Sequence, residues 1–73
     1  MVQYYAITKY GMTKTAPFAL VRFKEGIFEI FRNGSWEETR QFDDILIGEF
    51  NDYEIITDDE AKAIQQKMMA RIT

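Results

Sequence analysis

An Asn33-Gly34 pair between two alternating segments constrains the fold of this chain more than any other feature. Both central residues of a type I′ turn need positive φ, which Asn and Gly adopt readily, so the pair predicts a tight hairpin. Glu25-Gly26 predicts a second two-residue turn just upstream. Because such turns fix strand register, they also predict which side chains share a face of the sheet.

The whole pattern predicts one small α+β domain spanning residues 1–73. We expect a four- or five-stranded antiparallel meander sheet with one C-terminal helix packed on one face. The expected strands cover residues 2–10, 18–24, 27–32 and 35–39 or 35–40. Residues 41–56 are left open between a fifth strand at 45–47 and a loop that covers the sheet, with 53–56 extended.

Thr57 and Glu60 form the two ends of a capping box, which predicts a helix over about residues 58–72. In this motif the Thr side chain accepts from the backbone N–H at Glu60, and the Glu side chain reaches back to the cap. The helix carries an apolar stripe at helical spacing, made of Ala61, Ile64, Met68 and Ile72. A helix with one apolar face needs the sheet as its partner.

The two turn registers divide the central strands into an apolar face and a mixed face. The apolar face consists of Ala19, Val21, Phe23, Phe28 and Ile30, and we expect it to receive the helix. The mixed face contains an expected interaction surface of Leu20, Arg22, Glu29, Phe31 and Trp36, with Ile27 and Glu38 beside it. This face either binds another molecule or is covered by the chain itself, for which the candidates are Tyr10, Phe42, Ile45 and Leu46.

Catalytic chemistry finds little support in the composition. The chain has no His and no Cys, so the commonest general base and the thiolate nucleophile are both missing. Ser35 is the single Ser and lies beside a turn. An enzyme using only Asp43 with Asp44 is disfavoured, because neighbouring side chains of an extended segment point apart. We therefore expect no enzyme, no catalytic residue and no cofactor.

Acidic residues are concentrated between residues 43 and 60, where no Lys or Arg occurs. The expected acidic surface is Asp43, Asp44, Glu49 and Asp52. Its spacing does not match a calcium-binding EF-hand loop, so no metal site is predicted. A solvated face with helix-capping acids is one interpretation. The other is an acidic regulator, such as an immunity-like inhibitor that binds a basic partner through residues 43–60.

Nucleic acid and membranes are not expected partners. Tyr4, Tyr5 and Tyr10 with Lys9 and Lys14 have the mixture of aromatic and basic residues found in single-strand binding platforms, but the net charge of −3 has the wrong sign. The sequence has no apolar run long enough to span a bilayer, and its start lacks the pattern of a signal peptide. We expect a cytoplasmic protein.

Two motifs carry a resemblance to known sequences: Gly34-Ser35-Trp36 and Ile56-Thr57-Asp58-Asp59-Glu60-Ala61. In this order, after an Arg-bearing strand, they resemble short uncharacterised bacterial proteins, a domain of unknown function with a Gly-x-Trp hairpin and a closing Ile-Thr-x-x-Glu-Ala helix. The likeness covers most of the chain and consists of structural motifs, so it implies no activity and no site residue. From the residues, we expect a non-enzymatic protein-interaction or accessory module, with a homodimer through the Trp36 sheet face as its simplest form.

Overall fold

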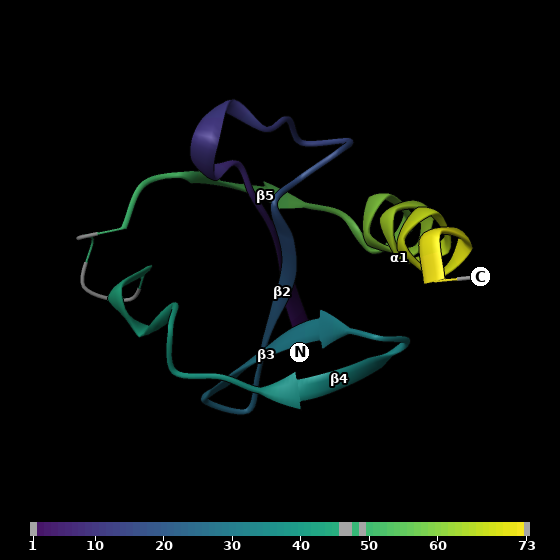
Figure 1. Ribbon diagram of the computed structural model, residues 1–73. Helices are drawn as coiled ribbons and strands as arrows, with labels where there is room; N and C mark the ends of the chain where they lie inside the picture. The colour runs from purple at the N-terminus through teal and green to yellow at the C-terminus, as the bar shows by residue number, and fades with distance from the viewer. Residues whose placement is uncertain (1, 46–47, 49, 73) are drawn as a thin grey trace.

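The computed structural model describes residues 2–45, 48 and 50–72, with the backbone alone at residues 44, 71 and 72. It confirms the α+β fold: a five-stranded antiparallel sheet in the order β4-β3-β2-β1-β5, with one helix against β1 and β2 (Figure 1). The elements are β1 (Val2–Ile7), η1 (Lys9–Gly11), β2 (Ala19–Lys24), β3 (Ile27–Arg32), β4 (Ser35–Glu38), η2 (Asp43–Ile45), β5 (Tyr53–Ile56) and α1 (Asp58–Ile72).

Both predicted hairpin turns and their registers are confirmed. Asn33 and Gly34 have φ of 52° and 84°, and Glu25 and Gly26 have φ of 52° and 82°, the two consecutive positive values of a type I′ turn. As expected, Phe31 pairs with Trp36 across β3 and β4, and Arg22 pairs with Glu29 across β2 and β3.

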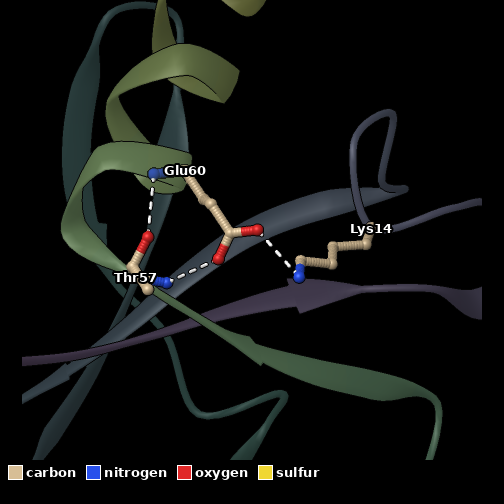
Figure 2. Close-up of polar contacts among 3 residues, drawn as sticks. All are labelled: Lys14, Thr57 and Glu60. Atoms are coloured by element: carbon tan, nitrogen blue, oxygen red, sulfur yellow. Dashed lines mark hydrogen bonds and ion pairs between the residues drawn. The ribbon is translucent and has the colours of Figure 1, made fainter.

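The helix start is confirmed in atomic detail (Figure 2). The Thr57 Oγ1 accepts from the Glu60 N–H at 3.2 Å, and Glu60 Oε1 accepts from the Thr57 N–H at 3.0 Å. The second carboxylate oxygen of Glu60 lies 2.8 Å from the Lys14 Nζ. The capping box therefore also ties the loop between β1 and β2 to the first turn of α1.

The prediction of which face receives the helix is wrong. Ala61 and Ile64 of α1 are buried with Leu20, Phe31, Ala6 and Ile56, on the face that carries Trp36. The physical reason lies in β5. Ile56 pairs with Tyr4 and belongs to the mixed face, so the chain leaves β5 on that side and the helix starts there at once.

The apolar face is covered instead by the chain between β4 and β5. Phe42 and Ile45 are buried against Val21 and Phe28, and Phe50 packs beside them. Phe42 and Ile45 were expected to cover the other face. Leu46 was expected there too, but it lies outside the described residues. The expected candidate Tyr10 covers neither face, since it is 76% exposed.

Two expected boundaries also change. The first strand ends at Ile7 rather than at residue 10, because η1 follows and Tyr10 has a φ of 61° that no strand accommodates. Residues 43–45 form a short 3₁₀ helix, and the fifth strand is Tyr53–Ile56. The expected strand at 45–47 lies partly outside the described residues.

Candidate functional site

The helix leaves part of its own sheet face uncovered, next to the buried Leu20 and Phe31. The accessible side chains there form what we call the Trp36 surface, defined by Tyr4, Arg22, Ile27, Glu29 and Trp36. All but Ile27 are half-buried, and Ile27 is 44% exposed. The surface thus combines aromatic, aliphatic and paired charged groups on one face of the sheet.

Arg22 is held at the centre of the Trp36 surface by two contacts. Its Cζ lies 4.3 Å from the centroid of the Trp36 ring, and its Nε donates to Glu29 Oε1 at 2.7 Å. A guanidinium over an indole face is attracted by the ring quadrupole. The carboxylate of Glu29 also faces Glu38 across β3 and β4, so Arg22 offsets the repulsion of two like charges.

Trp36 is fixed on its other sides by two further rings. Its centroid lies 5.2 Å from that of Phe31 and 6.1 Å from that of Tyr4, both in tilted geometry. Phe31 is buried beneath the helix, so it anchors the indole to the core. The indole and guanidinium are therefore held in place before any partner arrives.

The expected interaction residues fall into a buried group and an accessible group. Leu20 and Phe31 lie under the helix at 0% and 8% exposure and cannot contact a partner. Arg22, Glu29 and Trp36 remain accessible at the Trp36 surface. Sequence reasoning missed Tyr4, which pairs with Arg22 across β1 and β2. No tight turn joins those strands, so no local signal fixed their register.

The expected acidic surface is not brought together in the part of the chain that the structure describes. Asp43 lies in η2, where its Oδ2 accepts from Arg40 Nε at 3.3 Å. Asp52 is exposed ahead of β5, and its backbone C=O accepts from the Thr8 N–H. Glu49 and the side chain of Asp44 lie outside the described residues. The acidic regulator stays a prediction.

Several hollows indent the described surface. One of them, of about 240 Å³, borders the Trp36 surface and is lined by Gly26, Ile27, Phe28, Glu38, Thr39, Arg40 and Asp43. Within the described ranges, no cluster of three potential metal ligands occurs. None of the helices described there is long and apolar enough to cross a membrane.

Three side chains that lie away from the Trp36 surface, Tyr5, Lys14 and Glu60, have shifted pKa values. The hydrogen bond from Lys14, followed by that from the Thr57 N–H and then by the charge of Lys14, lowers the pKa of Glu60, and Glu60 in turn raises the pKa of Lys14. Burial raises the pKa of Tyr5, with a further contribution from Tyr53. These groups lie in the capping box and in the core.

Comparisons with protein families, curated proteins and solved structures find no match to this chain. The resemblance to a bacterial domain of unknown function therefore stays a prediction, and the function rests on the geometry alone.

Proposed function

We propose that this chain is a non-enzymatic protein-interaction module that forms a homodimer through the Trp36 surface. The observation that carries the proposal is the assembly of Arg22, Trp36 and Glu29, which is ordered, half-buried and placed where the helix stops covering the sheet. Trp, Tyr and Arg dominate the energetically important positions of protein interfaces. Prior ordering lowers the entropy that such side chains lose on binding.

A second copy is the partner that the charges of this face favour. Arg22 and Lys24 supply positive charge, whereas Glu29 and Glu38 supply negative charge. A twofold axis places one surface against itself, so a surface with both signs can meet its own complement.

Contact through the face is favoured over pairing of the outer strand β4. That strand carries Glu37 and Glu38, one on each side of the sheet, and both are exposed. Charged side chains on an edge strand oppose the addition of a like strand. A dimer of ordinary size needs about 800 Å² from each copy, roughly a sixth of the accessible area of 4978 Å².

Sedimentation equilibrium from micromolar to millimolar concentration tests the proposal. The wild-type mass should rise toward twice the chain mass of 8.6 kDa, and the emission of Trp36 should shift to the blue as the indole loses water. A monomer over the whole range, with unchanged emission, would overturn the homodimer.

A charge-swap pair localises the contact without disturbing the core. We expect the proposed dimer to pair Lys24 of one copy with Glu38 of the other. Lys24→Glu or Glu38→Lys would make this a contact between like charges and should weaken the dimer, while the double variant should restore it. Lys62→Glu is the matched control, since Lys62 is exposed on α1 and changes the net charge equally. Equal weakening by Lys24→Glu and Lys62→Glu would remove the Trp36 surface as the interface.

A further inference from the structure

Strand β5 is the outer strand at the other edge of the sheet, beside β1 (Figure 1). Two backbone hydrogen bonds fix the phase of the β1–β5 ladder. The Thr8 N–H donates to the Asp52 C=O at 2.8 Å, whereas the Ile7 C=O accepts from Phe18 on the β2 side. Antiparallel ladders alternate, so Ala6 directs its polar backbone groups toward Glu54 of β5.

The same alternation directs the backbone N–H and C=O of Ile55 away from β1, toward the open edge. The neighbouring outward donors are already used. The Tyr53 N–H donates to the Asn51 C=O at 2.9 Å, and the Thr57 N–H donates to Glu60 Oε1 (Figure 2). Ile55 therefore offers a short stretch of edge on which an added strand can form hydrogen bonds.

The side chains around this edge define the chemistry of the strand that fits it. Ile55 is 61% exposed, and it shares a sheet face with Tyr53. Glu54 points to the opposite face, where it is exposed. Three more exposed acids flank the strand in sequence, Asp52 before it and Asp58 and Asp59 after it. None of these four acids forms an ion pair among the described residues.

We propose that β5 binds an extended segment of a partner protein in which apolar residues alternate with Lys or Arg. The segment adds to the sheet at Ile55, a form of recognition in which main-chain hydrogen bonds supply affinity and alternate side chains supply specificity. Its apolar residue lies opposite Ile55, and its basic residues lie on the face of Glu54. A second copy of β5 is disfavoured by charge, because it would bring the acids around one strand close to those around the other.

This edge differs from β4, the other outer strand. Strand β4 presents Glu37 on one face and Trp36 with Glu38 on the other, and so offers no exposed aliphatic side chain. Of these two described outer strands, only β5 combines an exposed aliphatic residue and an outward N–H with a border of exposed acidic side chains. The surface is also separate from the Trp36 surface, so its occupancy does not depend on the proposed dimer.

A labelled peptide, Lys-Val-Lys-Val-Lys-Val-Lys with blocked ends, tests the proposal by fluorescence anisotropy with the full chain. Binding should weaken about tenfold or more when Glu replaces each Lys. Methylation of the Val backbone nitrogens should weaken binding about tenfold, because those N–H groups face β5, whereas methylation of the inner Lys nitrogens should leave it unchanged. Equal affinity of the two methylated peptides, or no binding at all, would overturn strand addition.

Variants of the protein give an independent check. Ile55→Pro removes the outward N–H without removing a bond to β1 and should abolish peptide binding, whereas Ile55→Thr keeps the N–H and should retain part of it. Far-ultraviolet circular dichroism verifies the fold of each variant. Lys24→Glu should bind the peptide like wild type, which separates this site from the dimer. Loss of self-association in Ile55→Pro would show that β5 pairs with itself and would overturn the proposal.

Discussion

Arg22 lies over the ring of Trp36, with 4.3 Å between its Cζ and the ring centroid, and its Nε lies 2.7 Å from Glu29 Oε1 on the neighbouring strand. The side chains of the ion pair are only 19% and 25% exposed, so the pair is partly shielded from water. One guanidinium thus links three strands, through the indole on β4, the carboxylate on β3 and its own backbone on β2.

Arg22→Lys should lower the free energy of unfolding by about 0.5–1 kcal/mol, because an ammonium cannot stack on the indole and keep a planar bond to Glu29. Urea titration followed by circular dichroism measures the change. Arg32→Lys is the matched control, since Arg32 is exposed on the opposite face of β3. Equal losses in both variants would show that the stacking contributes nothing.

Leu20→Ala should destabilise the protein by about 2–5 kcal/mol, because it opens a cavity beneath the helix. Leu20 is 0% exposed, whereas its neighbour Phe18 is 53% exposed despite its larger ring. Phe18→Ala should therefore change stability by no more than about 0.5 kcal/mol. Thermal unfolding of both variants tests the position of the helix, and a larger loss in Phe18→Ala would contradict it.

Thr57→Ala should cost about 0.5–2 kcal/mol, because the Glu60 N–H loses its acceptor at the start of the helix. For a domain of this size, each kcal/mol lowers Tm by about 4–8 °C, which calorimetry resolves. Thr57→Ser keeps the oxygen and should recover most of the loss. Thr15→Ala serves as a control for removal of an exposed threonine. A Thr57→Ala variant as stable as wild type would show that the cap is dispensable.

The ion pair between Glu60 and Lys14 should hold its contribution to the free energy of unfolding constant over a range of pH (Figure 2). That contribution should fall at an acidic and at an alkaline limit. The folded-state pKa of Glu60 is lowered, so its contribution is complete above the ordinary value of 4.5 and is lost as pH falls through the lower folded value. The folded-state pKa of Lys14 is raised, so its contribution is complete below 10.5 and is lost as pH rises through the higher folded value.

Urea midpoints measured across pH test this prediction. Glu60→Gln keeps a capping side chain but should reduce the loss of stability at acidic pH. Lys14→Met should reduce the loss of stability at alkaline pH. If both variants lose stability with pH as the wild type does, other groups control the pH dependence.

Local chemistry explains what could be predicted from the sequence. The turns at Asn33-Gly34 and Glu25-Gly26 act within four residues, so they determined the registers of β2, β3 and β4. The capping box at Thr57 acts within three residues, so it determined the start of α1. The Arg22–Glu29 pair followed directly from the β2–β3 register that the Glu25-Gly26 turn sets.

Non-local packing explains what could not be predicted. The face that receives the helix depends on which side β5 leaves the sheet, and β5 joins β1 from about fifty residues away in sequence. The apolar content of the face around Val21 and Phe28 could not decide this, because Phe42 and Ile45 cover it equally well. Tyr4 belongs to the Trp36 surface because the β1–β2 register pairs it with Arg22. No tight turn sets that register, so the position of Tyr4 could not be predicted.

The contiguous β2–β4 meander has a consequence for how the molecule assembles. Its strands are joined by two-residue turns, so they can close rapidly, whereas β5 and α1 must reach back across most of the chain. Until α1 docks, nothing from the helix covers Leu20 and Phe31, so this part of the sheet is open to intermolecular contact. We expect aggregation during folding to depend on how soon α1 buries these two side chains.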